Sequence, residues 1–143
     1  MGKSGEIMKR KIIRDVMLLS QKSTPATLAD LQTVVDLEDT LRANYDICVG
    51  MAANMIGIRK CIIVISILET IVPMLNPEII KCSQPYTAEE SCLSLDGVRS
   101  VKRYKNITVK YQDRSFKTCI SDFSGFTAQI IQHEIDHCNG VVV

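Results

Sequence analysis

The sequence Gln132-His133-Glu134-Ile135-Asp136-His137, near the end of the chain, constrains the fold more than any other stretch. On an α-helix, His133 and His137 lie four residues apart, so both imidazoles project from one face with their Cβ atoms about 5–6 Å apart. Two ligands at that separation can bind one metal ion, and Glu134 between them is placed to take a proton from water. A solvated helix carrying two unrelated histidines is the alternative. Apolar residues flank the motif and favour a packed helix with a metal site; they are Phe126, Ile130, Ile131 and Ile135.

Two helices are predicted from periodicity and end signals. Ser124 is a good N-cap and Gly140 a good residue to follow a helix, so the metal motif belongs to a helix between them. Thr27 begins a second helix over about residues 28–43, with Asp30 as a weak capping box. Its apolar residues fall mostly on one side, which is typical of a helix that packs on a core.

Several β-branched or alternating runs predict strands. Turns are expected at Asn76-Pro77 and over residues 83–85. Proline, glycine and clusters of polar residues usually interrupt strands. Strands that come in runs rather than alternating with helices favour an α+β fold, with antiparallel sheets packed around the C-terminal metal-binding helix. The predicted strands are residues 61–67, 71–75, 78–82, 105–111 and 116–120, the last two as a hairpin.

Length and charge limit the classes of protein. A chain of 143 residues is expected to form one domain over residues 1–143. Its net charge of +1 gives no electrostatic reason to bind nucleic acid or an anionic membrane. There is no signal-peptide core or membrane-length apolar run, and we expect the six cysteines to stay reduced, so the cytoplasm is the expected compartment.

A catalytic metal needs a third protein ligand, with the fourth position left to water. Little sequence follows the histidine motif, so the ligand is expected upstream. The best candidate is Cys92, in a predicted loop over residues 89–94 between acidic and small residues. A thiolate there is preferred because the chain has no third histidine.

A second stretch, residues 48–57, combines small residues with glycines in an apolar setting. It is either a tight turn beside a buried strand or a place where the backbone approaches a ligand closely. The residues alone leave both interpretations open.

Taken together, three stretches resemble the peptide deformylase family. The family's motifs are Gly-x-Gly-apolar-Ala-Ala-x-Gln, Glu-Gly-Cys-Leu-Ser and Gln-His-Glu-x-Asp-His. In the family's order, this chain has Cys48-Val49-Gly50-Met51-Ala52-Ala53-Asn54-Met55, Glu90-Ser91-Cys92-Leu93-Ser94 and Gln132-His133-Glu134-Ile135-Asp136-His137. The resemblance implies a peptide deformylase-like α+β fold and removal of the formyl group from N-formylmethionyl peptides.

The resemblance also implies a metal and a substrate. Cys92, His133 and His137 would bind one divalent ion, Fe²⁺ in the family, with Zn²⁺, Ni²⁺ or Co²⁺ as substitutes. The substrate would be an N-formylmethionyl peptide, including nascent chains at the ribosome. No membrane and no specific nucleic acid is implied as a partner.

Roles can be carried over by position. Glu134 would move the proton, and the backbone N–H of Leu93 would hold the developing oxyanion. The substrate-binding residues would be Val49, Gly50, Met55, Ser91 and Ile130, with Gly50 pairing with the peptide as an added strand. His133 would also border the methionine pocket. Gln132 and Asp136 would orient the ligands.

The chain departs from the family pattern at three positions. Cys48 replaces the first glycine and Ser91 the glycine of the second motif. Met55 replaces a glutamine whose amide helps to hold the formyl oxygen, and a thioether has no hydrogen to donate. Asn54, one residue away, would substitute only if the local backbone were re-aimed.

Three functions therefore stay open at the level of sequence. The first is a deformylase, with full or reduced efficiency or with another N-acyl substrate. The second is a catalytically weak or silent metal-binding protein of the same fold. The third is a general metallopeptidase, against which the upstream cysteine argues. Retention of Glu134 favours an enzyme, because a structural metal site has no use for that carboxylate.

Overall fold

The computed structural model describes residues 10–92 and 94–143. Within these residues, five antiparallel strands form one sheet in the order β1-β2-β3-β4-β5, which confirms the α+β prediction. In chain order the elements are α1 (Val16–Leu19), η1 (Leu28–Asp30), α2 (Leu31–Ala43), β1 (Gly50–Ala52), η2 (Ala53–Ile56), β2 (Ile62–Ile67), β3 (Thr70–Cys92), β4 (Leu95–Gln112), β5 (Thr118–Ser124) and α3 (Gly125–Cys138). None of the helices in the described part of the chain is long and apolar enough to cross a membrane.

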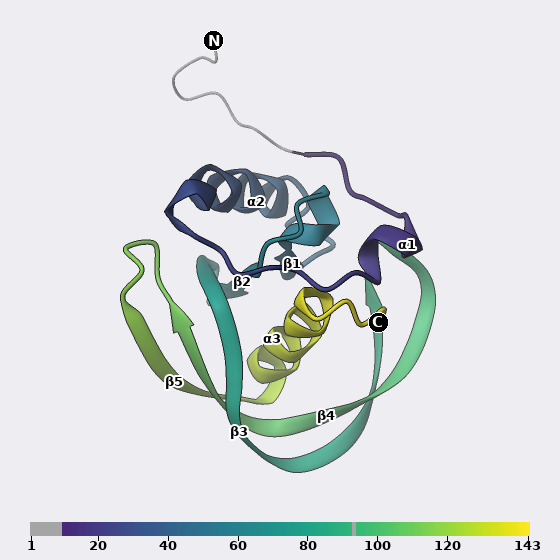
Figure 1. The fold of residues 1–143 in the computed structure, drawn as a ribbon. Helices are drawn as coiled ribbons and strands as arrows, with labels where there is room; N and C mark the ends of the chain where they lie inside the picture. Colours follow the sequence, from purple (N-terminus) through teal and green to yellow (C-terminus); the bar gives the residue numbers. More distant parts are fainter. Residues whose placement is uncertain (1–9, 93) are drawn as a thin grey trace.

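Strand β2 lies between two hydrophobic layers, with α2 on one side and α3 on the other (Figure 1). Successive side chains of a strand point to opposite faces. Val64 therefore packs in the cluster that contains Leu37 of α2, whereas Ile65 packs in the cluster that contains Ile131 of α3. Burial on both faces explains why this strand is a continuous apolar run rather than an alternating one.

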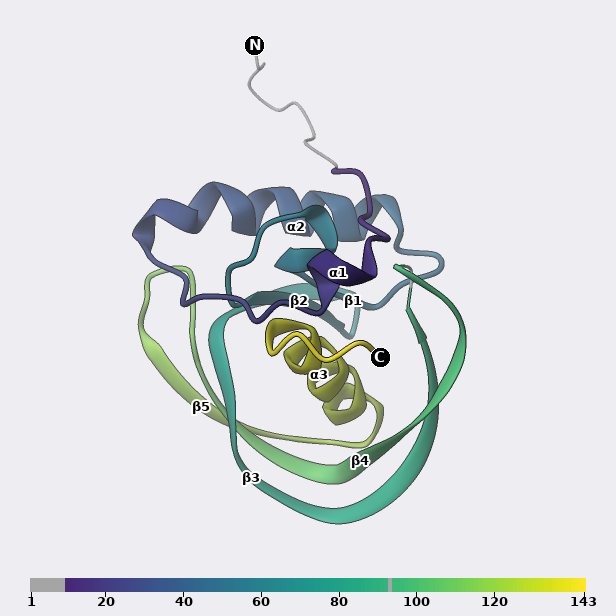
Figure 2. The ribbon, with the colours of Figure 1, turned by 45° about the vertical axis from the view of Figure 1, so that its right-hand side comes forward.

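Strands β3 and β4 form a long hairpin that curves around α3 (Figure 2). The turn expected at Asn76-Pro77 and the break over residues 83–85 are wrong, because β3 continues through both. At Asn76, with φ +52°, the register shifts between Leu75 and Glu78, so an irregularity in the pairing absorbs the bend. Pro85 still lies opposite Tyr104 in β4. The predicted short strands at 71–75 and 78–82 are thus one strand, and the strand at 105–111 is the end of a longer one.

The β4–β5 hairpin is confirmed, although β5 begins at Thr118 rather than at Phe116. Gln112 lies opposite Thr118 at its closed end. The predicted loop over residues 89–94 is shorter than expected, since β3 extends to Cys92 and β4 begins at Leu95. The cysteine is therefore held by the end of a strand.

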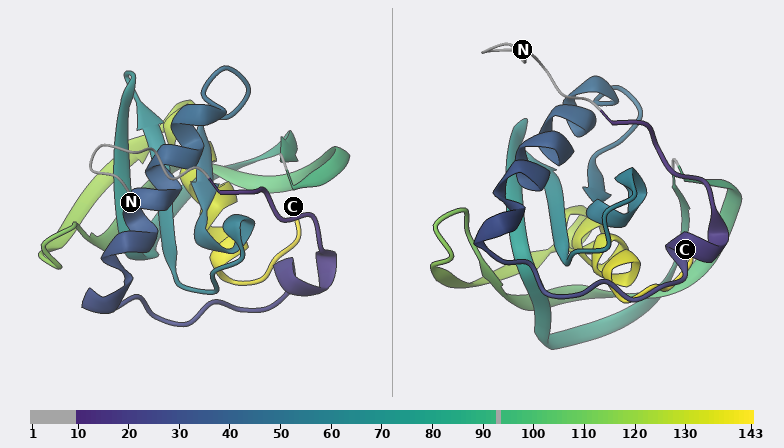
Figure 3. Two further views of the ribbon diagram at one scale, coloured as in Figure 1. Left: turned by 90° about the horizontal axis from the view of Figure 1, so that it is seen from above. Right: turned by 45° about the horizontal axis from the view of Figure 1, so that its top comes forward.

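The ends of both predicted helices are confirmed to within a few residues. Ser124 is the N-cap of α3, and residues 28–30 form a turn of 3₁₀ helix before α2. Gly140 has φ +74°, and a Cβ atom there would lie 2.7 Å from the carbonyl oxygen of Ser20. Glycine thus lets the chain after α3 lie against the segment after α1 (Figure 3).

Candidate metal centre and substrate cleft

Helix α3 presents both histidines toward the inside of the curved hairpin. His133 and His137 are 7% and 0% exposed, and their Nε2 atoms are 3.3 Å apart. The two ring planes meet at 63°. Both imidazoles therefore aim the same nitrogen at one point, as the i, i+4 spacing predicts.

The end of β3 brings Cys92 to the same point. Its Sγ lies 3.4 Å from Nε2 of His137, and the three donor atoms all lie within 4.8 Å of one another. In a tetrahedral site with metal–nitrogen bonds of about 2.0–2.1 Å and a metal–sulfur bond of about 2.3 Å, two nitrogens lie about 3.3 Å apart and nitrogen and sulfur about 3.5 Å apart. The chemistry and spacing of these donors fit one divalent ion with a fourth position free.

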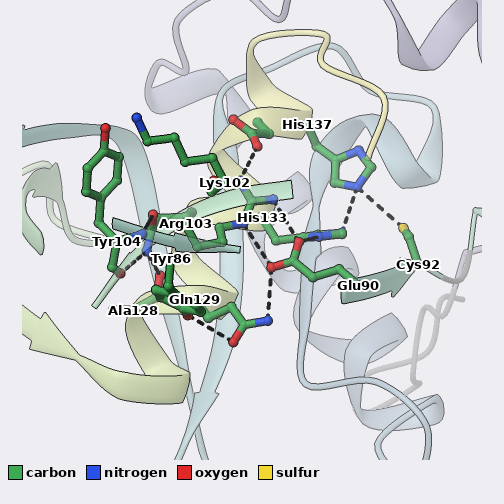
Figure 4. Close-up of polar contacts among 12 residues, drawn as sticks. Tyr86, Glu90, Cys92, Lys102, Arg103, Tyr104, Ala128, Gln129, His133 and His137 are labelled. Carbon is green, nitrogen blue, oxygen red and sulfur yellow. Dashed lines mark hydrogen bonds and ion pairs between the residues drawn. The ribbon is translucent and has the colours of Figure 1, made fainter. Parts of the chain in front are cut away.

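A buried carboxylate supports one of the histidines. Nδ1 of His133 lies 2.7 Å from Oε1 of Glu90, which fixes the ring so that Nε2 faces the metal point. Arg103 binds both carboxylate oxygens of Glu90, with contacts of 2.7 and 2.9 Å, and its third nitrogen binds Asp136 at 2.7 Å. Figure 4 shows this chain of contacts from α3 through Glu90 to β4.

The charges of this network determine which histidine is protonated before a metal binds. Burial opposes ionisation of Glu90, but hydrogen bonds from His133 and Arg103 outweigh it and lower its pKa to about 2. Burial also disfavours the charged form of His133, but hydrogen bonds to Cys92 and Glu90 raise its pKa to about 10. Burial, with the neighbouring His133 charge, lowers the pKa of His137 to about 3. The buried network therefore favours the protonated form of His133 and the neutral form of His137.

Glu134 lies beside the donor cluster and is 4% exposed. Burial raises the pKa of its carboxyl group to about 7, and its Oε1 has no hydrogen-bond partner among the described residues. A carboxyl group with a near-neutral pKa can both accept and return a proton. Gly50 makes room for it, because a Cβ atom there would lie 2.7 Å from Ile130 and 3.1 Å from Oε2 of Glu134.

A cavity of about 380 Å³ opens beside this cluster. It is lined by Cys92, His133 and Glu134 and by all five residues predicted to bind substrate, namely Val49, Gly50, Met55, Ser91 and Ile130. The predicted oxyanion donor, Leu93, lies outside the described residues. Cys48 also lines the cavity, and burial raises the pKa of its thiol to about 12, so it stays neutral.

Met55, at the position of the family's glutamine, and the neighbouring Asn54 contact different partners. Met55 is 1% exposed, and its Sδ accepts a hydrogen bond from the backbone N–H of Ala52 at 3.4 Å. The side-chain amide of Asn54 donates to the carbonyl oxygen of His137 at 2.9 Å. Asn54 therefore supports the last turn of α3 and does not line the cavity. At Gly50 the backbone lies close to α3, and Gly50 also lines the cavity, so close approach of this segment to a ligand stays a prediction.

Gln132 and Asp136 were predicted to orient the ligands, and the structure gives each a different contact. The amide of Gln132 exchanges two 2.8 Å hydrogen bonds with the backbone of Tyr104, which fastens α3 to β4. Asp136 contacts Arg103, so its link to His133 passes through Glu90.

Sequence reasoning assigned no role to Glu90, Arg103 or Gln129. Gln129 lines the cavity and donates to Oε2 of Glu90 at 3.0 Å. One signal was available for Glu90, because metal-bound histidines usually donate to a carboxylate and two glutamates precede Cys92. Arg103 gave no such signal, since its contacts depend on how β4 packs against α3.

Comparison with known proteins relates this arrangement to one family. A family model described as "Polypeptide deformylase" matches residues 9–143. A peptide deformylase of Clostridium beijerinckii is 53% identical over 136 residues, covering 95% of this chain and 100% of the relative. Another from Thermoanaerobacter pseudethanolicus is 38% identical, covering 93% of this chain and 84% of the relative.

Solved structures give the same result. The Met-Ala-Ser-bound class I type b peptide deformylase from Acinetobacter baumannii superposes with a TM-score of 0.85 at 27% identity, covering 94% of this chain and 96% of the other. The peptide deformylase from Thermotoga maritima gives 0.84 at 31% identity, with 94% of both chains covered.

Proposed function

The chain belongs to the polypeptide deformylase family, and from that premise we propose which of its residues carry out the family's reaction. The protein is a metallohydrolase that removes the N-formyl group from nascent peptides. The family match decides against a general metallopeptidase, and the 53% identical relative favours an enzyme over a silent binding protein.

Cys92, His133 and His137 are the proposed ligands of one divalent metal ion. The convergence of their three donor atoms within 4.8 Å is the observation that carries this assignment. One thiolate with two imidazoles is a soft to borderline donor set, which suits Fe²⁺, Zn²⁺, Ni²⁺ or Co²⁺ better than Mg²⁺ or Ca²⁺. We infer Fe²⁺ as the native ion from the resemblance. When bound, such an ion polarises a carbonyl group and makes water more acidic.

Glu134 is the proposed general base and acid. Its buried carboxyl group, with a pKa of about 7, takes a proton from the attacking water and returns it to the leaving amine. Glu90 and Arg103 do not react; they hold the ring of His133 in place through contacts of 2.7 to 2.9 Å. Exclusion of water from Glu134 strengthens its interaction with the substrate.

The peptide is proposed to bind as an extended strand along Val49 and Gly50. Strand β1 pairs with β2, and its other edge borders the cavity, so its backbone is available to a peptide. Val49, Ile130 and His133 border the proposed pocket for the methionine side chain, and Met55 and Ser91 line the same cavity. The backbone N–H of Leu93 is the proposed oxyanion donor.

We extend the proposal to nascent chains at the ribosome and to the cytoplasm as compartment. All six cysteines are free thiols, which suits a reducing compartment. Formate release from ribosome–nascent-chain complexes, measured with purified components, tests the first point.

A formate-release assay on formyl-Met-Ala-Ser tests the proposed function. Protein purified without oxygen and loaded with Fe²⁺ should release formate, and acetyl-Met-Ala-Ser should serve as the matched control with an added methyl group. No release from the formylated peptide by protein that contains one metal ion per chain would contradict the proposal.

A further inference from the structure

Gln129 is a polar residue that lines the cavity. It lies on α3 one turn before His133, and the same cavity is lined by the apolar residues Phe126, Ile130 and Val49 as well as by Glu90. A side chain that enters the cavity next to the proposed metal ligands therefore meets an amide as well as hydrocarbon groups. The amide of Gln129 has no role in the proposed hydrolysis of the formyl group.

The contacts of Gln129 determine which way its amide is turned. The carboxylate of Glu90 can only accept hydrogen bonds, so the atom 3.0 Å from it is the amide nitrogen Nε2. The amide oxygen then accepts from the hydroxyl group of Tyr86 at 3.1 Å (Figure 4). Both partners fix the amide plane, because Glu90 is itself held by Arg103 and His133.

This arrangement leaves one hydrogen of the amide nitrogen over. Nε2 carries two hydrogens, and Glu90 uses one of them. The second has no protein acceptor in the described ranges 10–92 and 94–143. Water can satisfy it while the cavity is empty, but a side chain that fills the cavity displaces that water. A wholly hydrocarbon side chain would leave the N–H without a partner, which is unfavourable.

The chemistry of the cavity indicates which side chain suits this N–H. A carboxylate is disfavoured, because the negatively charged Glu89 lines the same cavity. A thioether is apolar enough for Phe126 and Ile130 and still offers a weak acceptor on sulfur.

We propose that Gln129 is a specificity-determining residue, whose free amide N–H lets the cavity select methionine over an isosteric hydrocarbon side chain. This inference rests on the proposed function, since it concerns the side chain next to the formylated amine. The amide N–H would distinguish a substrate side chain with a sulfur atom from one with a methylene group at the same place. Apolar contacts alone discriminate poorly between these two groups.

Paired substrates test the proposal. Formyl-Met-Ala-Ser and formyl-norleucine-Ala-Ser differ by one sulfur atom in place of one methylene group. The ratio of their kcat/KM values is measured for wild type, Gln129→Leu and Gln129→Met, with metal content and thermal unfolding recorded for each. Two variants are used so that one remains informative if the other does not fold.

Wild type should prefer the methionine substrate about three- to thirtyfold. Both Gln129 variants should bring the ratio to about one or reverse it, with norleucine turnover rising because no N–H is stranded. Tyr86→Phe removes one of the two partners that fix the amide plane, so its ratio should fall between those of wild type and the Gln129 variants.

Affinities of the product peptides Met-Ala-Ser and norleucine-Ala-Ser, measured by calorimetry, should show the same change in ratio. An unchanged ratio in folded Gln129 variants that hold metal would overturn this inference alone. Absence of formate release from both substrates by metal-loaded wild type would instead overturn the proposed function.

Discussion

Nδ1 of His133 donates to Oε1 of Glu90 over 2.7 Å, so a proposed metal ligand on α3 is oriented by a residue two positions before Cys92, the proposed ligand on β3. Glu90 is in turn neutralised by Arg103, whose side chain is 5% exposed. The proposed metal ligands therefore share one buried network that spans β3, β4 and α3.

Glu90→Gln should weaken metal binding about 10- to 100-fold, because the amide is a poorer acceptor for His133. Competition with a chelator measures this affinity. Glu38→Gln is a matched control, since Glu38 is also buried and paired with an arginine, Arg114, away from the metal site. Both variants should unfold at a lower denaturant concentration than wild type, but only Glu90→Gln should lose metal affinity. Equal metal affinity in the two would contradict the role given to Glu90.

Asn54→Ala should speed metal loss, because its amide holds the backbone carbonyl of His137 at 2.9 Å. Removing one such buried hydrogen bond costs about 1–3 kcal/mol in the free energy of unfolding. Asn76→Ala serves as the control, because that amide bonds the backbone of Ala26 instead. Cobalt-loaded protein gives the readout: the metal off-rate and the visible spectrum should change for Asn54→Ala and stay unchanged for Asn76→Ala. Identical behaviour of the two would show that Asn54 acts on stability alone.

Met55→Gln should raise kcat about ten- to a thousandfold if the wild type lacks one oxyanion donor. The glutamine oxygen can keep the hydrogen bond from the Ala52 N–H that Sδ of Met55 accepts, which leaves the amide nitrogen for the cavity. Steady-state formate release measures kcat and KM, and kcat should change more than KM. Since Asn54 is engaged by His137, a fast wild type with no gain in Met55→Gln would point to a donor elsewhere in the cavity.

Much of this site could be predicted from sequence because its parts are local. His133, Glu134 and His137 fall on one helix turn, and the spacing alone specifies their common face. Cys92 lies far from the histidines in sequence, and only the absence of a third histidine and the family motif around it indicate a ligand there. The ends of α3 could likewise be predicted from Ser124, a good N-cap residue, and Gly140, which adopts a positive φ.

The remainder depends on contacts between distant segments. Asn76-Pro77 and Pro85 are strong strand breakers in sequence, yet β3 continues because a curved hairpin accommodates a shift in register. Arg103 lies in an ordinary alternating strand and becomes part of the metal site only when β4 packs against α3. The direction of the Asn54 amide likewise follows from the position of α3 and could not be read from its neighbours.

The most direct test of the account compares metal content and turnover in Glu134→Ala. The carboxylate is assigned to proton transfer and the metal to Cys92, His133 and His137, so the two properties should separate. We expect Glu134→Ala to hold one metal ion per chain by elemental analysis and to lose formate release by about 10²- to 10⁴-fold. Loss of the metal from that variant, or turnover equal to wild type, would contradict the assignment of Glu134.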